Sequence, residues 1–271
     1  MERMISHMVI MHIGDVVGKI GRRTLAALAP DLIEQYSPDL VVVNGENAAG
    51  GSGITSSTAE DIFAAGADVI TTGNHVWTQR EAQKLLERDQ RILRPANYPP
   101  GTPGVGHGVF PSRKNAEPVG VMIFNGRVFM RELDCPFRGA DEILGTMLEQ
   151  TRVVLVDFHA EATSEKMALG RHLDGRVSAV VGTHTHVQTA DEQILPGGTA
   201  YITDVGMTGG TDSVIGVEIE PVLRRFTTQM PSRFDPPGRG PAMLCGVVLE
   251  VDPESGNAWK IERIQRDYMS G

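Results

Sequence analysis

The segment VVGTHTH, residues 180–186, places two histidines, His184 and His186, after an apolar run and a glycine. Side chains at positions i and i+2 share one face of an extended chain, whereas they point to different sides of a helix. Two imidazoles side by side at the end of a strand suit a metal ion. On this segment alone, two polar residues in a surface loop are an equally good explanation.

Carboxylate, amide and imidazole side chains follow four more apolar runs. These ends are Gly14-Asp15, Asn44-Gly45-Glu46-Asn47, Gly73-Asn74-His75 and Asp157-Phe158-His159-Ala160-Glu161. In open α/β sheets, ligands bind outside the carboxyl ends of the strands. Turn-forming Asp, Asn and Gly would explain any one end, but not the repeated histidines and acids. We therefore predict one shared metal site.

Glycine stands immediately before these polar clusters at positions 14, 45, 73 and 182, where it permits a sharp exit from a strand and a close backbone approach. The segment GDVVGKIG, residues 14–21, is one residue short of a phosphate-binding loop, and Ile20 stands where Ser or Thr would bind Mg²⁺. The segment GENAAGGSGIT, residues 45–55, is either a flexible turn or a turn whose backbone N–H groups face a substrate phosphate. We favour the second interpretation.

The elements that must position these residues alternate along the chain. Solid apolar runs joined by helical patterns indicate parallel strands that are buried on both faces. Strands are expected at residues 8–14, 39–45, 67–73, 118–126, 151–161, 177–184, 199–206 and 242–252, and helices at 23–37, 57–66, 78–89, 140–150 and 161–173. Pro30 is expected to interrupt the first helix. A loop rich in Pro and Gly covers residues 94–108, and the whole chain, 1–271, is expected to form a single α/β domain.

The composition limits the partners. The net charge of the 271 residues is −9, so broad contact with nucleic-acid phosphates or an anionic membrane is not expected. A small anionic substrate remains compatible, because a bound cation reverses the local field. Cys135 and Cys245 form no CxxC pair, which argues against a zinc-thiolate site or a disulfide scaffold. With neither a signal peptide nor a membrane span recognised, a cytoplasmic protein is expected.

Taken in order, the five strand ends resemble the motifs of the calcineurin-like metallophosphoesterase superfamily, which are D-x-H, G-D, G-N-H, a lone H and G-H-x-H. The matching stretch runs from Asp15 to His186. The chain departs from the pattern at Val17, Glu46, Val76 and Thr183. Together with the segments GDVVG, RPANYP and DFHAEATSEK, these departures resemble the YmdB-type branch. The resemblance implies a sandwich of two β-sheets flanked by helices, in four αββα layers.

The resemblance also implies a dinuclear centre. One metal ion would be held by Asp15, Glu46, Asn47 and His186, and the other by Glu46, Asn74, His159 and His184. Glu46 would bridge the two ions, because a carboxylate has two oxygens. Oxygen and imidazole ligands without thiolate suit iron, manganese or zinc, and relatives commonly hold iron or manganese.

The activity that the resemblance implies is hydrolysis of small phosphodiesters such as 2′,3′-cyclic AMP. Two metal ions clamp the phosphate and supply a hydroxide that attacks phosphorus in line, and His75 protonates the leaving oxygen as general acid. A phosphomonoesterase or protein phosphatase on the same site is an alternative. A second alternative is a regulator that binds metal or nucleotide, with incidental catalysis. Self-association is left open. The other histidines, His7, His12, His107 and His172, are expected to have solvated or structural roles.

Overall fold

Two β-sheets face each other in the computed structural model, which describes residues 7–270. The first sheet has the strand order β2-β12-β13-β1-β3-β4-β5, with β14 paired to β13. Its strands are β1 (Met8–Ile13), β2 (Asp15–Val16), β3 (Leu40–Asn44), β4 (Val69–Thr71), β5 (Ile92–Leu93), β12 (Met207–Gly210), β13 (Gly240–Val251) and β14 (Ala258–Ser270). Strands β1, β3, β4 and β5 run parallel, and β13 is antiparallel to β1.

The second sheet has the order β10-β11-β9-β8-β7-β6. Its strands are β6 (His107–Pro111), β7 (Pro118–Asn125), β8 (Val154–His159), β9 (Ala179–Thr183), β10 (Gln193–Ile194) and β11 (Ala200–Ile202). Strands β7, β8, β9 and β11 are parallel. The carboxyl ends of these strands and of those in the first sheet therefore supply the loops that carry the polar motifs.

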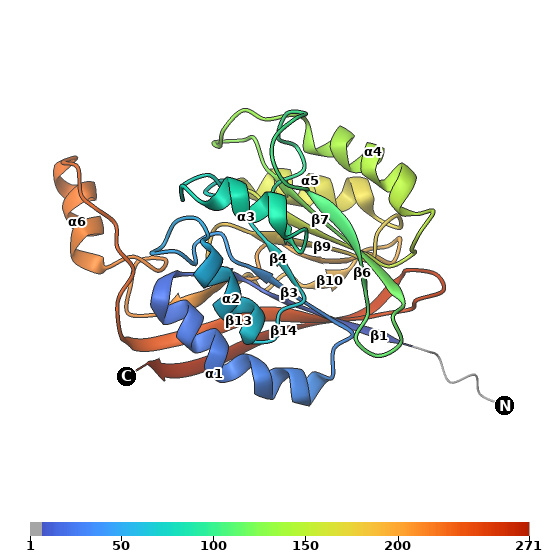
Figure 1. The fold of residues 1–271 in the computed structure, drawn as a ribbon, viewed down its shortest axis with the longest axis horizontal. Helices are drawn as coiled ribbons and strands as arrows, with labels where there is room; N and C mark the ends of the chain where they lie inside the picture. The colour runs from blue at the N-terminus through green and yellow to red at the C-terminus, as the bar shows by residue number, and fades with distance from the viewer. Residues whose placement is uncertain (1–6, 271) are drawn as a thin grey trace.

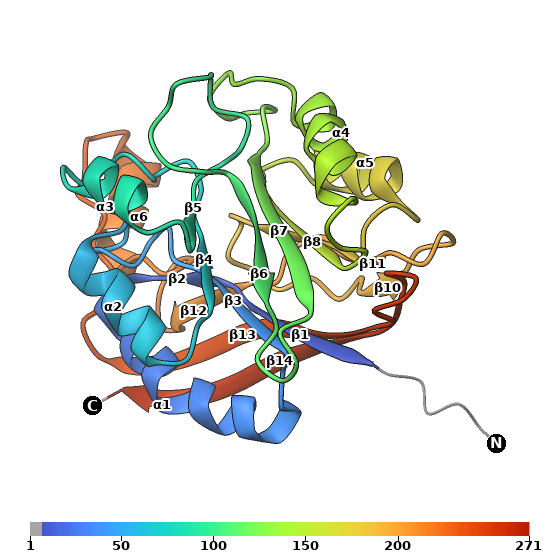
Figure 2. The same cartoon turned by 45° about the vertical axis from the view of Figure 1, so that its right-hand side comes forward.

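Helices cover both outer faces of the sandwich (Figure 1). They are α1 (Gly18–Tyr36), α2 (Ser56–Ala64), α3 (Ala82–Arg88), α4 (Pro136–Met147), α5 (Thr163–Leu173) and α6 (Ile219–Thr228). Helices α1 and α2 lie on the first sheet, and α4 and α5 lie on the second (Figure 2). The expected four-layer αββα sandwich is confirmed. Helix α6 lies apart from both sheets.

The strand pattern explains the layers, because successive side chains of a strand point to opposite faces. In β1, Val9, Met11 and Ile13 pack under the helices of the first sheet, whereas Met8 and Ile10 face the second sheet. A third apolar cluster, which includes Phe124 and Phe158, lies between the second sheet and helices α4 and α5.

Some sequence expectations were wrong in detail. Helix α1 continues through Pro30, which is exposed together with Ala26. Because Pro30 has no backbone N–H, the Ala26 carbonyl oxygen lacks its helical hydrogen bond. Both residues lie on the solvent face, where water can bond to this oxygen. Helix α3 starts at Ala82 rather than at residue 78, and β6 begins inside the expected loop. Strand β14 was not expected, because charged residues obscure its alternation. Its antiparallel ladder to β13 pairs Gly240 with Ser270 at one end and Val251 with Ala258 at the other.

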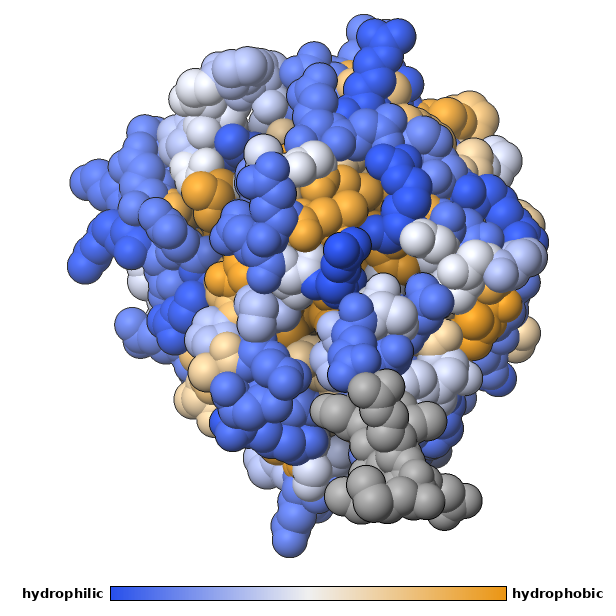
Figure 3. All heavy atoms as spheres, turned by 90° about the vertical axis from the view of Figure 1, so that its right-hand side faces the viewer, coloured by the Kyte–Doolittle hydropathy of each residue, from blue (hydrophilic) through white to orange (hydrophobic). Residues whose placement is uncertain are grey.

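The molecular surface is mostly hydrophilic on the side where β1 begins, and its apolar residues form small separate areas (Figure 3). A pocket of about 530 Å³ lies near this end and is lined by Met8, Glu117, Thr151 and Glu254, among others. It has none of the imidazoles that make a transition-metal site. None of the helices within residues 7–270 has the length and hydropathy needed to span a membrane.

Candidate metal centre

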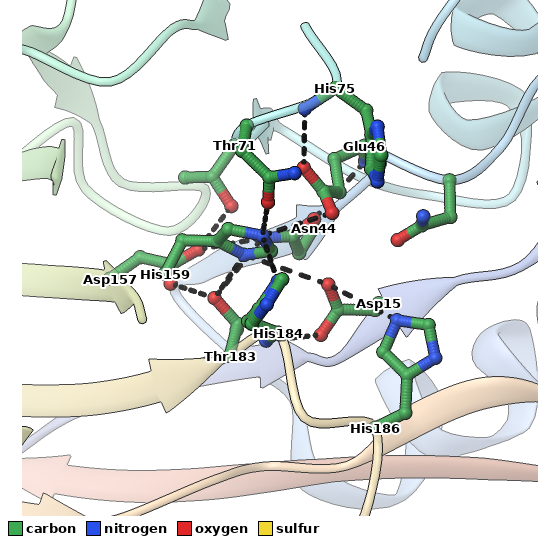
Figure 4. Close-up of polar contacts among 12 residues, drawn as sticks. Asp15, Asn44, Glu46, Thr71, His75, Asp157, His159, Thr183, His184 and His186 are labelled. Atoms are coloured by element: carbon green, nitrogen blue, oxygen red, sulfur yellow. Dashed lines mark hydrogen bonds and ion pairs between the residues drawn. The ribbon is translucent and has the colours of Figure 1, made fainter. Parts of the chain in front are cut away.

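The polar strand ends of the two sheets meet at one place (Figure 4). The first sheet contributes Asp15 at β2, Glu46 after β3 and Asn74 after β4. The second sheet contributes His159 at the end of β8 and, after β9, the two histidines of the opening motif. The structure thus brings together six of the seven side chains predicted to hold metal, and the seventh, Asn47, lines the same pocket as Glu46 and His184. Their assignment as ligands stays a prediction.

The centre of the cluster is the Nε2 atom of His159. Within 3.0 Å of it lie Glu46 Oε1 at 2.9 Å, Asn74 Oδ1 at 3.0 Å and His184 Nδ1 at 3.0 Å. A ring nitrogen has one proton or one lone pair, so it cannot bond all three neighbours. A cation among these atoms would satisfy them together, and Glu46, His159 and His184 form a group that could hold a metal ion.

Each imidazole of the cluster is held from outside through its other nitrogen. His159 Nδ1 lies 2.9 Å from Thr183 Oγ1, and His184 Nε2 lies 3.2 Å from Glu161 Oε2. His186 Nδ1 donates to the Ile215 carbonyl oxygen at 2.8 Å. Metal-binding histidines have this arrangement, because the outer hydrogen bond fixes the tautomer and the ring orientation.

Two buried oxygens of the cluster have no hydrogen-bond partner, Asp15 Oδ1 and Asn47 Oδ1. Asp15 Oδ1 lies 3.7 Å from His159 Nδ1 and 4.0 Å from His186 Nε2. Both distances are too long for a hydrogen bond. Buried polar atoms are nearly always satisfied, so each exception needs an explanation. Metal ligation explains both oxygens, and the donor set therefore fits the metal ions that the fold implies.

Burial and charge both shift the pKa values of the cluster. Burial raises the pKa of Asp15 to about 6. Burial opposes ionisation of Glu46, but the adjacent His159 outweighs it and lowers the Glu46 pKa to about 2. Burial also opposes a charged His159, yet Glu46 raises the pKa of its imidazole to about 9. Burial and the nearby His159 charge lower the pKa of His184 to about 3. A cation that binds His159 Nε2 must displace a proton.

The loop that follows β9 and carries His184 and His186 is strained. His184 and His186 adopt φ angles of 97° and 67°, which non-glycine residues rarely adopt. Asp204 holds the residue between them, because its Oδ2 accepts from Thr185 N at 3.0 Å and from Thr185 Oγ1 at 2.7 Å. The buried Lys166 ammonium donates to the same oxygen at 2.7 Å. Such strain persists only where the surroundings over-determine it.

Glycine is required at two of the strand ends. A Cβ at Gly73 would lie 2.2 Å from Glu46 Oε2 and 2.4 Å from His159 Nε2, and one at Gly182 would lie 1.7 Å from the Thr203 carbonyl oxygen. Any larger residue would push the cluster apart, as the sequence pattern suggested. The structure does not support the interpretation that backbone N–H groups of the 45–55 turn face a phosphate, because two of these groups are bonded within the turn. Gly51 N donates to the Asn47 carbonyl oxygen at 3.1 Å, and Ser52 N donates to the Ala49 carbonyl oxygen at 3.3 Å.

Glu46, His184 and His186 of the cluster line a pocket of about 390 Å³. His75 lines this pocket, and its backbone N–H donates to Glu46 Oε2 at 3.2 Å. Asn47 also lines it, while its Nδ2 donates to the Gly51 carbonyl oxygen at 3.0 Å. The apolar residues that line the pocket are Val17, Ile215, Val217, Phe234 and Pro236.

The sequence analysis missed several residues of the site. Glu161 was seen at a strand end but received no role. Asp157 precedes His159 by two positions in β8, which places both side chains on one face of the strand. This spacing could have revealed Asp157 as a residue of the site. Lys166, Asp204 and Phe234 gave no usable signal, because their relation to the site depends on the packing of distant segments.

Comparison with known proteins shows the family of the chain. A family model described as YmdB-like protein matches residues 11–264. The 2′,3′-cyclic-nucleotide 2′-phosphodiesterase of Bacillus subtilis (strain 168) is 48% identical over 255 residues, which cover 94% of this chain and 96% of that protein.

Two crystal structures share the fold. A hypothetical protein from Thermus thermophilus has a TM-score of 0.89 at 43% identity, covering 96% of this chain and 99% of that one. A novel phosphatase from Mycoplasma pneumoniae has a TM-score of 0.91 at 35% identity, covering 98% and 96%. The resemblance seen in the sequence is therefore confirmed, and the chain belongs to the YmdB-like protein family.

Proposed function

We propose that this protein hydrolyses small phosphodiesters, with 2′,3′-cyclic nucleotides as substrates, at a centre of two metal ions. The observation that carries the proposal is the orientation of the three imidazoles. His159, His184 and His186 each have one nitrogen engaged outside the cluster, and the other faces its carboxylate, amide or imidazole neighbours. The Bacillus subtilis relative, named for hydrolysis of 2′,3′-cyclic nucleotides, supports the substrate class.

The cluster residues divide between the two ions as follows. Asp15, Glu46, Asn47 and His186 would hold one ion, and Glu46, Asn74, His159 and His184 would hold the other, so that both would share Glu46. Carboxylate, amide and imidazole ligands without thiolate suit iron, manganese or zinc, and we expect iron or manganese. When bound, such ions polarise phosphoryl oxygens and lower the pKa of bound water.

His75 has a separate role in the proposed reaction. It follows the ligand Asn74, and its side chain lines the pocket. As the bond between phosphorus and the leaving ribose oxygen breaks, that oxygen gains negative charge and needs a proton. The imidazolium of His75 donates this proton as general acid.

The activity is tested by comparing diesters with monoesters. The purified protein, supplied with Mn²⁺ or Fe²⁺, should hydrolyse 2′,3′-cyclic AMP and bis-p-nitrophenyl phosphate with higher kcat/KM than adenosine 2′-monophosphate and p-nitrophenyl phosphate. A preference for the monoesters would instead identify a phosphomonoesterase, the activity suggested by the name of the Mycoplasma structure.

The apolar residues that line the pocket support a nucleotide over a simpler phosphodiester. Phe234 is 44% exposed although it lines the pocket. An aromatic ring in a site that also binds phosphate offers a face on which a nucleobase can stack. Pro236 and Ile215 line the pocket with it. We therefore place the base of the substrate against Phe234.

Removing this ring should impair nucleotides selectively. Stacking contributes about 1–3 kcal/mol per base, so Phe234→Ala should lower kcat/KM for 2′,3′-cyclic AMP by about 5- to 150-fold, mainly through KM. Ribose 2′,3′-cyclic phosphate without a base should be unaffected. Phe226→Ala is the matched control, because Phe226 is 73% exposed on α6 and does not line the pocket. Equal losses for both substrates would place the base elsewhere.

A further inference from the structure

A buried polar chain runs from the space between the two sheets to His159 (Figure 4). Thr183 Oγ1 lies 2.9 Å from His159 Nδ1 and 2.7 Å from Asp157 Oδ1. The three residues are fully buried. His159 and Thr183 are opposed in the register of β8 and β9, and Asp157 lies two residues earlier on β8. The Thr183 hydroxyl is the outer partner of His159 described above, but none of the roles proposed so far uses Asp157 behind that hydroxyl.

Asp157 is surrounded by donors from the first sheet. Its Oδ2 accepts from Thr71 Oγ1 at 2.5 Å and from Asn44 Nδ2 at 3.2 Å, and it lies 3.3 Å from His12 Nε2. These residues belong to β4, β3 and β1, whereas Asp157 belongs to β8 of the second sheet. An isolated buried carboxylate would be costly, so this set of donors indicates that the structure is built to retain its negative charge.

The hydrogen bonds of Thr183 have only one consistent direction. A carboxylate accepts and cannot donate, so the single hydroxyl proton of Thr183 points to Asp157 Oδ1. The lone pairs of Oγ1 are then left to accept, from His159 Nδ1–H and, at 3.4 Å, from Asn44 Nδ2. Asp15 Oδ1 is 3.7 Å from His159 Nδ1 and is too distant to replace Thr183 as acceptor.

We propose that Asp157 and Thr183 are positioning residues for His159, which keep a proton on Nδ1 and leave Nε2 as the nitrogen that binds metal. This inference rests on the proposed metal centre. It gives a purpose to Thr183, the residue that separates Gly182 from His184 where the superfamily motif has glycine next to histidine. A carboxylate hydrogen-bonded directly to a metal-binding histidine also fixes the proton on the outer ring nitrogen. Here the Thr183 hydroxyl lies between the histidine and the Asp157 carboxylate and links the two.

The test is metal affinity in the full chain, measured without substrate. Thr183→Val keeps the shape of the side chain and removes the hydroxyl, whereas Thr183→Ser keeps the hydroxyl. Competition with a chromophoric chelator should show that Thr183→Val binds Zn²⁺ at one of the two sites about 10- to 100-fold more weakly than the parent. Thr183→Ser should stay within about threefold, because a serine hydroxyl can make the same two bonds.

A matched control is Thr203→Val. Thr203 is also a buried threonine of the second-sheet region, and its hydroxyl donates to Asp191 Oδ2 at 2.5 Å. No hydrogen bond links it to a predicted ligand within residues 7–270. Thr203→Val should lose thermal stability and keep the parental Zn²⁺ affinity. If Thr183→Val and Thr183→Ser lose equal affinity, or if neither loses any, the proposal is wrong.

A spectroscopic measurement on the unaltered protein tests the same inference if Thr183→Val does not fold. In Zn²⁺-loaded protein with ¹⁵N-labelled histidine, His159 should show a protonated Nδ1 and a metal-shifted Nε2. The opposite pattern would overturn the proposal. Neither readout needs turnover, so a protein that binds Zn²⁺ as expected but does not hydrolyse phosphodiesters would contradict the proposed activity and leave this inference intact.

Discussion

Replacing Glu46 with glutamine should abolish turnover and lower the occupancy of both metal ions. The Glu46 side chain is buried, its Oε1 lies 2.9 Å from His159 Nε2, and its Oε2 accepts from His75 N at 3.2 Å. An amide has one oxygen and no negative charge, so it cannot bridge two cations. Metal stabilisation of the transition state contributes several kcal/mol, and each 1.4 kcal/mol is tenfold. The expected loss in kcat is about 10³-fold or more.

The measurement is elemental analysis together with kcat for 2′,3′-cyclic AMP. The parent protein, purified without chelator, should contain close to two transition-metal ions per chain, because the cluster has ligands for two. Glu165→Gln is the matched control: Glu165 is also buried, but it accepts from Arg127 N and Val128 N outside the pocket. His186→Ala should weaken mainly one ion. Equal and mild effects of Glu46→Gln and His186→Ala would show that the bridge is wrongly assigned.

Replacing His75 with alanine should lower kcat without removing metal. A general acid contributes about 10²- to 10⁴-fold, and this loss should occur with 2′,3′-cyclic AMP, whose leaving group is a poor alkoxide. Bis-p-nitrophenyl phosphate should lose much less, because p-nitrophenolate departs without a proton. The dependence on leaving group separates an acid from a metal ligand or a packing residue, whose loss would affect both substrates alike.

The matched control for His75 is His172→Ala. His172 Nε2 lies 3.0 Å from Asp141 Oδ1 on the surface, outside the pocket, so its removal should leave both activities unchanged. Loss of metal from the His75 variant, measured by elemental analysis, would make His75 a ligand. Unchanged biological activity of that variant in cells would instead favour the regulatory alternative.

The sequence by itself determined the central apolar strands and the chemical types at their ends. Apolar runs such as those of β1, β3 and β8 are local signals, because a strand buried on both faces needs nearly continuous apolar residues. Their carboxyl ends carried Asp15, Glu46 and His159, and the rule that such ends share one edge placed them together. The order of the motifs then supplied the family. These features depend only on short segments and on their sequence order.

Local patterns were less reliable where solvent or a neighbouring strand decides the outcome. Pro30 could not be placed within α1 without knowing that its turn faces solvent. Strand β14 depends on its hydrogen bonds to β13 rather than on its own alternation. The 45–55 turn uses two of its N–H groups internally, which its glycine content did not reveal. In each case the missing information was a partner outside the segment.

Only the tertiary structure decided which atoms of the site face the centre of the cluster and which are held from outside. The nitrogen that each imidazole offers depends on Thr183, Glu161 and the Ile215 carbonyl oxygen. The hydrogen bond between Asn44 and Asp157 joins residues 113 positions apart and crosses from one sheet to the other. No local pattern encodes such a distance, because it is fixed when the apolar faces of the two sheets pack together. The sequence therefore determined the donors at the strand ends, and the packing of the sheets determined their orientation and their hydrogen-bond partners.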